Sequence, residues 1–127
     1  MSAVGIETVV DRELPSVVES VPYARDLVAW SVPPALRHDV ALVVSELVAN
    51  AVKHGSGPIG LRVDVNEADG ATTVCIAVRD EGNGRPAPDD GYGLHIVGHL
   101  AIATGVDADA HGKTVWAELR TGVNTTR

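Results

Sequence analysis

Polar side chains of the kinds that bind ligands recur at helical spacing between residues 46 and 54. Glu46, Asn50, Lys53 and His54 stand at i, i+4, i+7 and i+8, so one helix would project a carboxylate, an amide and an imidazole in a row. The row lies beside an apolar stripe that predicts packing against a core. It is narrower and poorer in Glu/Lys pairs than an ordinary exposed face, which favours a ligand site; a solvated face is the alternative.

A second group, the sequence DEGNG at residues 80–84, ends a run in which apolar and polar residues alternate. This alternation places Asp80 on the apolar side of a strand, where an unpaired carboxylate costs on the order of several kcal/mol. Asp80 therefore needs a fixed donor, and a ligand amino group would serve. Gly82 and Gly84 would allow close backbone approach to a flat ligand. The alternative is a tight strand-exit turn in which Asp80 accepts hydrogen bonds from backbone amides.

A third group, the sequence GYGL at residues 91–94, places glycines where a helix is predicted to begin. The unpaired amides and the helix dipole make such a start an anion site, above all for phosphate. Asp89 and Asp90 immediately upstream would cap the helix but repel a triphosphate unless a cation lies between them. This combination predicts Mg²⁺; the alternative is a glycine hinge needed for packing.

Three weaker signals are predicted to carry no function. Residues 55–60 spell a dinucleotide-binding fingerprint, but they follow a predicted helix and precede a predicted strand, which reverses the required context. His95 and His99 lie four residues apart with no apparent third metal ligand. Cys75 has no positively charged neighbour in its strand except Arg79, so a reactive thiol is not expected.

The elements that must position these groups follow from periodicity and from turn residues. Strands are predicted near residues 4–10, 61–65, 72–80, 106–110 and 114–120, and helices at 15–30, 35–54 and 92–103. Their order is strand, two helices, two strands, helix, two strands, which predicts an α+β fold with a mixed sheet covered on one face by helices. With neither repeats nor a long linker, residues 1–127 are expected to form one domain, of which 121–127 are a loose polar tail.

Composition excludes several classes of function. Acidic residues number 17 against 10 Lys and Arg, the net charge is −7 and aromatic content is 3%, which argues against nucleic acid as the main partner. The single cysteine rules out a disulfide framework and fits a reducing cytoplasm. The N-terminus has no signal-peptide pattern, and no apolar stretch reaches the roughly 18 residues of a membrane span. A cytoplasmic protein is therefore expected.

Taken in order, ELVANAVKHG at residues 46–55, DEGNG at 80–84 and GYGL at 91–94 resemble the N, G1 and G2 boxes of the GHKL ATPase/kinase superfamily. The closest likeness is to the small bacterial anti-sigma-factor serine/threonine kinases. It covers nearly the whole chain, including GKTVW at residues 112–116. The resemblance implies the Bergerat fold, a two-layer α/β sandwich that holds ATP between sheet and helices.

Residue by residue, the resemblance implies that Asn50 ligates Mg²⁺ and that Glu46 is the catalytic base for a protein serine. Asp80 would bond the adenine amino group, with Gly82 and Gly84 lining the base pocket. The same resemblance places further residues at the nucleotide, with the glycines facing the phosphates and the threonine supporting the adenine end: His54, Gly91, Tyr92, Gly93, Leu94 and Thr114.

Two functions follow from this resemblance. The first is a kinase that sequesters a sigma factor and phosphorylates an anti-anti-sigma (STAS) protein. The second is a non-catalytic ATP-binding interaction module, because residues 85–90, between the second and third boxes, are few for an ATP lid. Strand parity also turns Trp116 to the sheet face opposite Val115. That face could form a homodimer or partner surface, unless a strand or loop covers it.

Overall fold

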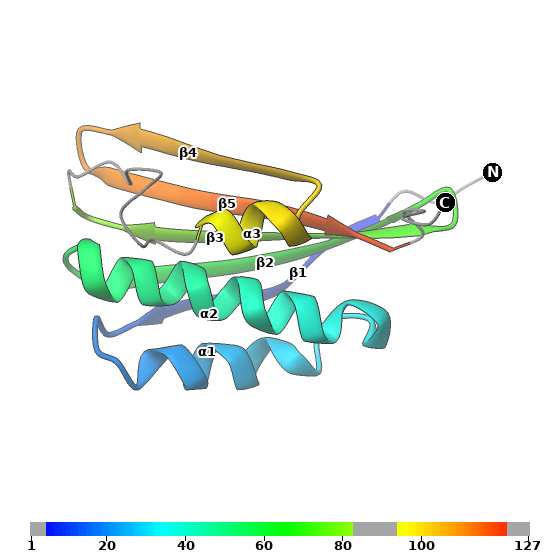
Figure 1. Cartoon of the computed structure of the whole chain (residues 1–127), viewed down its shortest axis with the longest axis horizontal. Coiled ribbons are helices and arrows are strands. Elements are labelled where there is room, and N and C mark those ends of the chain that lie inside the picture. The colour runs from blue at the N-terminus through cyan, green and yellow to red at the C-terminus, as the bar shows by residue number, and fades with distance from the viewer. Residues whose placement is uncertain (1–4, 83–93, 122–127) are drawn as a thin grey trace.

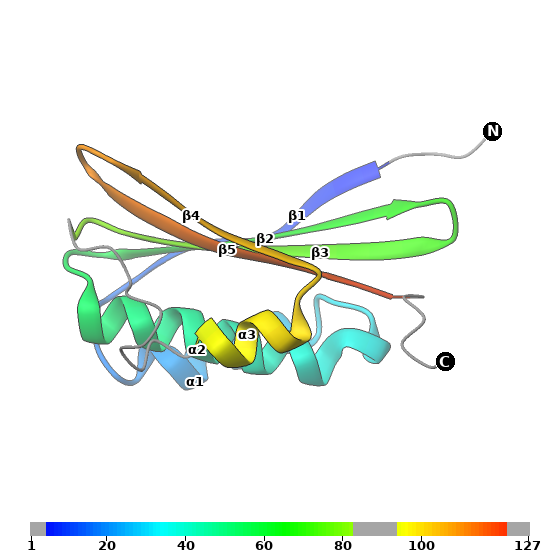
Figure 2. The ribbon, with the colours of Figure 1, turned by 45° about the horizontal axis from the view of Figure 1, so that its top comes forward.

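A five-stranded sheet packs against three helices in the computed structural model, which describes residues 5–82 and 94–121 and, for Leu94 and His95, the backbone alone. The elements are β1 Gly5–Leu14, α1 Ser20–Ala29, the short 3-10 helix η1 Pro34–Leu36, α2 Arg37–His54, β2 Ile59–Ala68, β3 Ala71–Asp80, α3 Leu94–Leu100, β4 Ala103–Asp109 and β5 Gly112–Arg120. All three helices lie on one face of the sheet (Figures 1 and 2). The predicted two-layer α/β sandwich is confirmed.

The sheet is antiparallel throughout its described strands, with the order β1-β2-β3-β5-β4, and the expected mixed sheet is wrong. The reason lies in the connections. Two antiparallel helices, α1 and α2, separate β1 from β2 and return the chain to the edge where β1 ended, so β2 runs opposite to β1 (Figure 1). The single helix α3 does bring β4 parallel to β3, but β5 lies between them and pairs with both.

The first helix begins later than the sequence indicated. We expected it to start at Pro15, whereas α1 starts at Ser20 after a turn in which the Ser20 hydroxyl donates to the Pro15 carbonyl at 2.6 Å. The physical reason is Pro22. Proline lacks a backbone N–H and is tolerated in the first helical turn but not in the interior. A helix that began at Ser16 would have placed Pro22 in its second turn.

The core lies between α2 and the inner face of the sheet, as periodicity predicted. The apolar stripe of α2 is buried, and so are the alternate residues of β3 and β5: Val40, Val43, Val44, Leu47, Ala51, Val74, Ile76, Val78, Val115, Ala117 and Leu119. Burying one such Val or Leu stabilises the fold by roughly 1.5–3 kcal/mol. On α3, where periodicity predicts an inner stripe that includes Val97 and Gly98, Val97 is buried but Gly98 is exposed.

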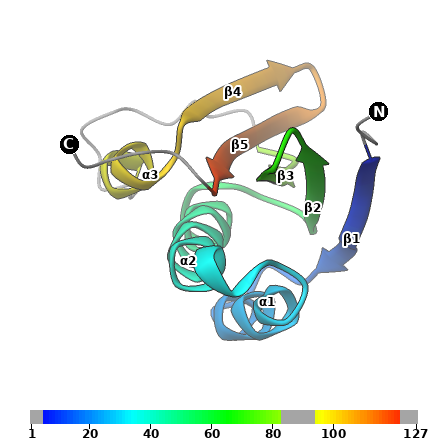
Figure 3. The same ribbon diagram turned by 90° about the vertical axis from the view of Figure 1, so that its right-hand side faces the viewer.

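The opposite face of the sheet carries Trp116, as strand parity predicted. Its side chain is half-buried because the indole lies over Gly105 of the neighbouring strand β4: a Cβ built on Gly105 would come within 2.7 Å of the indole nitrogen. In the end-on view of Figure 3 the described helices all lie on the other side of the sheet. That this face forms a homodimer or partner surface stays a prediction.

The sequence predicts a loose polar tail at residues 121–127. Thr121, placed in the polar tail, is tied to β3, because its N–H donates to the Thr72 carbonyl at 2.8 Å and its hydroxyl accepts from the Thr72 N–H at 2.9 Å. Residues 122–127 lie outside the described part.

Within the described residues, none of the helices has the length and apolar character needed to cross a membrane.

Candidate functional site

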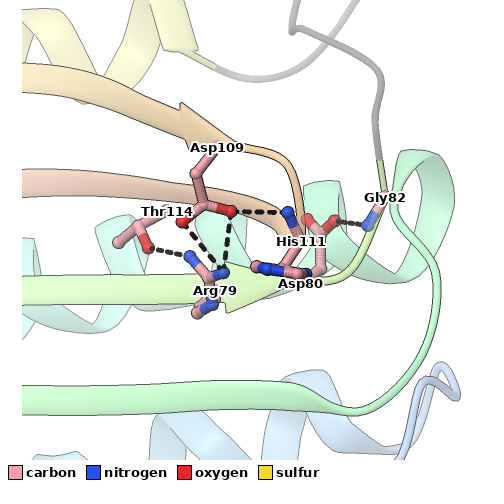
Figure 4. A network of polar contacts seen from close by, with 6 residues as sticks. All are labelled: Arg79, Asp80, Gly82, Asp109, His111 and Thr114. Carbon is pink, nitrogen blue, oxygen red and sulfur yellow. Dashed lines mark hydrogen bonds and ion pairs between the residues drawn. The ribbon is translucent and has the colours of Figure 1, made fainter.

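Asp80, the last residue of β3, points toward the helices and is 2% exposed. Its Oδ1 accepts the Gly82 N–H at 2.7 Å (Figure 4) and the Lys113 ammonium at 3.0 Å, and Lys113 also contacts Oδ2 at 3.0 Å. The sequence predicted that Asp80 must have a fixed donor. The structure supplies one from within the chain, together with the backbone amide that the strand-exit turn predicted.

Lys113 is the residue of this cluster that sequence analysis missed. It directly faces Asp80 in the antiparallel register of β3 and β5, and it is 4% exposed. The signal was present in the parity of β5, since the alternation that buries Val115 and Ala117 also turns residue 113 inward. Lysine is almost never fully buried unless it is paired, so the Asp80 carboxylate explains its position.

Glycines allow the end of α2 to approach the Asp80 carboxylate. A Cβ on Gly55 would overlap the Asp80 carboxyl carbon and lie 2.7 Å from the Ala51 carbonyl oxygen. A Cβ on Gly82 would come to 3.0 Å from Asp80 Oδ1. The Glu81 N–H donates to the Ser56 carbonyl at 2.8 Å and fastens the two segments together. The structure thus joins the first and second sequence groups at one edge of the sheet.

The polar positions of α2 differ strongly in burial. Asn50 is 9% exposed, Glu46 and His54 are half-buried, and Lys53 is exposed. Among the described residues none accepts a hydrogen bond from Asn50 Nδ2, although this atom is buried. An ordinary solvated face, the alternative for this row, does not describe Asn50. A buried amide without a partner in the described part of the chain marks a place where a ligand could bind.

Thr114 does not lie with these residues. It is on the opposite face of the sheet, where its hydroxyl accepts a hydrogen bond from Arg79 at 3.3 Å and where Arg79 also pairs with Asp109 at 3.2 Å (Figure 4). The His111 N–H and, after it, Arg79 hold the pKa of the exposed Asp109 carboxyl below its usual range. Because neighbouring residues of a strand face opposite ways, Lys113 and not Thr114 reaches Asp80.

Several predicted site residues lie outside the described part of the chain. These are Gly84, Gly91, Tyr92 and Gly93, together with the short segment 85–90, while Leu94 is the first residue of α3. The phosphate site and the glycine hinge at residues 91–94 therefore both stay predictions.

Cys75, one of the three weaker signals in the sequence, lies on β3 and is half-buried. Burial and, after it, the carboxylates of Glu118 and Asp64 raise the pKa of the Cys75 thiol, which favours the protonated and unreactive form. In residues 5–82 and 94–121 no group of three or more His, Cys, Asp or Glu side chains could hold a metal ion.

The three helices and the five-stranded sheet form a two-layer α/β sandwich, with the candidate site between sheet and helices. The family model of the histidine kinase-like ATPase domain matches residues 13–119 of the 127. The chain belongs to this family, which confirms the GHKL resemblance. A search of curated proteins finds no match to the chain.

Proposed function

We propose that this chain binds ATP with Mg²⁺ and acts as an anti-sigma-factor-like serine/threonine protein kinase. In this proposal it sequesters a sigma factor and phosphorylates an anti-anti-sigma partner with a STAS domain. The family match supports an ATPase-type domain. The kinase activity and the two partners rest on the likeness of the three sequence groups to the small anti-sigma kinases.

The observation that carries the proposal is the environment of Asn50. Its buried amide lacks a described acceptor for Nδ2, and it stands one helical turn from the half-buried Glu46 carboxylate. An asparagine side chain also offers an oxygen, the kind of ligand that Mg²⁺ prefers. The residues present fit a Mg²⁺–nucleotide complex in which Nδ2 of Asn50 would donate to an oxygen of the nucleotide, and the amide oxygen of the same side chain would hold Mg²⁺. When bound, Mg²⁺ supplies positive charge against the phosphates.

The remaining residues of the proposal contribute to nucleotide binding. Asp80 retains acceptor capacity for a base amino group, and Gly82 adds no side chain beside its carboxylate. His54 is half-buried at the C-terminal end of α2, close in sequence to Gly55. From the sequence groups alone, we assign contacts with the nucleotide to Gly84, Gly91, Tyr92, Gly93 and Leu94.

Glu46 is proposed to act as the general base. A serine or threonine oxygen of the partner protein forms a bond to the γ-phosphorus while the bond from that phosphorus to the β–γ bridging oxygen breaks. The hydroxyl proton passes to the Glu46 carboxylate, and ADP leaves. No described residue donates a hydrogen bond to this carboxylate, which leaves both of its oxygens able to accept.

Phosphoryl transfer from γ-labelled ATP to purified STAS-domain proteins tests this proposal. We expect the wild type to transfer label and Glu46→Gln to lose about 10²-fold or more of the rate while keeping ATP affinity. Glu19→Gln, an exposed glutamate just before α1, is the matched control and should keep full activity.

The non-catalytic module is the second candidate, favoured by the six residues 85–90 between the second and third groups. For such a module, the phosphoryl-transfer experiment has a different expected outcome from that for a kinase. ATP would bind to the wild type, no STAS protein would be labelled, and Glu46→Gln would change neither result.

A further inference from the structure

The ion pair at the end of β3 is the most buried polar contact among the described residues. The Lys113 side chain is 5% exposed and that of Asp80 is 3% exposed. The Lys113 nitrogen lies 3.0 Å from each carboxylate oxygen, and the Gly82 N–H adds a bond of 2.7 Å to Oδ1. Within the described part of the chain these are the only hydrogen bonds that either side chain makes.

The pair has hydrogen-bonding capacity left on both sides. A carboxylate has about four acceptor positions, and at most three of them are taken: two on Oδ1 by hydrogen bonds and one on Oδ2 by the ion-pair contact with Lys113. An ammonium has three N–H donors, and the hydrogen bond to Oδ1 and the contact with Oδ2 engage at most two. One acceptor on Asp80 and one donor on Lys113 therefore remain within the described residues, on groups that lie 3.0 Å apart.

We propose that Lys113 is a specificity-determining residue of the nucleotide site and that it reads the base together with Asp80. This inference rests on the proposed function. Asp80 accepts from an exocyclic amino group, and Lys113 donates to the unprotonated ring nitrogen beside it. The adenine edge formed by its 6-amino group and N1 has this pattern of one donor next to one acceptor.

Guanine presents the opposite pattern at the same edge. Its 6-oxo group would face the Asp80 carboxylate, and its N1–H would face the Lys113 ammonium. The first contact would place two acceptors together, and the second would place two donors together. A site built for one hydrogen-bonding pattern strongly rejects a ligand with the inverse pattern. Lys113 thus adds a second contact that distinguishes adenine from guanine, beside the one that Asp80 provides.

The affinities of ATP and 1-deaza-ATP, in which a C–H replaces ring nitrogen N1, test this proposal by calorimetry. We expect the wild type to bind 1-deaza-ATP about tenfold or more weakly, the usual size for loss of a hydrogen bond from a charged donor. In Lys113→Met the two nucleotides should bind equally. Lys53→Met removes the same charge at the exposed second lysine of the sequence and should keep the difference.

Equal affinity of the wild type for ATP and 1-deaza-ATP would overturn the role of Lys113 while leaving ATP binding intact. Failure of both nucleotides to bind at millimolar concentration would instead overturn the proposed function. Lys113→Met is interpreted only if circular dichroism and thermal unfolding show that it folds. The wild-type comparison decides the question without it.

Discussion

At the scale of single residues, the Asp80–Lys113 pair joins stability to the candidate site. Taking two charges out of water is costly, and their attraction offsets the cost only when the geometry is good and further bonds are made. Both conditions hold here, with contacts of 3.0 Å and the Gly82 amide as a third partner. Removing one partner leaves the other charge buried and uncompensated.

Lys113→Met should therefore lower the free energy of unfolding by about 3–5 kcal/mol, and the double variant Lys113→Met/Asp80→Asn by less than the sum of its parts. Urea denaturation followed by circular dichroism measures both. Arg62→Met is the control, because Arg62 and Asp64 form an exposed pair worth roughly 0–1 kcal/mol. If Lys113→Met lowered the free energy of unfolding as little as Arg62→Met does, the proposed energetic role of the Asp80–Lys113 pair would be contradicted.

The residues of the site were predictable to different degrees. The burial of Asp80 followed from the local alternation of β3 and was confirmed, because parity needs no knowledge of the partner strand. Lys113 required the register of β3 with β5, a contact between residues 33 positions apart in the sequence. Thr114 was placed at the nucleotide by likeness alone, and the parity of β5 puts it on the opposite face of the sheet.

At the scale of elements, the packing of α2 against the end of β3 depends on the absence of a side chain at Gly55. Gly55 has an ordinary φ of −96°, so alanine meets no backbone strain there. The added Cβ would nevertheless overlap the Asp80 carboxyl group and crowd the Ala51 carbonyl. Space, and not conformation, makes glycine necessary at the end of this helix.

Gly55→Ala is expected to cost about 1–3 kcal/mol of stability, the usual range for an overpacked site. Gly98→Ala on α3 is the matched control, since nothing lies within 4 Å of its Cβ position, and it should stabilise the fold by up to about 1 kcal/mol. Thermal unfolding of the two variants measures the difference. Equal melting temperatures would show that α2 and Asp80 are not in close contact.

Elements were easier to predict from the sequence than their pairing was. The helix and strand faces depend on local periodicity, and the stripes of α2, β3 and β5 are buried as expected. The direction of neighbouring strands depends on how many helices lie between them and on which strand inserts between two others. The antiparallel sheet, in which β5 separates β3 from β4, is such a non-local outcome.

At the scale of the whole molecule, the topology gathers the site from segments far apart in the sequence. The C-terminal end of α2, the last residue of β3 and the first residues of β5 meet at one edge of the sheet (left side of Figure 1). Asn50 and Glu46 lie on α2, about one and two turns before its C-terminal end, and Asp80 and Lys113 face each other where β3 ends and β5 begins. This is the edge at which we propose that Mg²⁺ and ATP bind.

Calorimetric titration with ATP, in the presence and absence of Mg²⁺, tests that claim most directly in the wild type and in Asn50→Ala. The control is Asn66→Ala on β2, whose side-chain oxygen is also buried without a donor in the described residues. We predict Mg²⁺-dependent binding that falls about tenfold or more in Asn50→Ala and is unchanged in Asn66→Ala. No heat of binding at millimolar ATP with Mg²⁺, or equal losses in the two asparagine variants, would contradict the account.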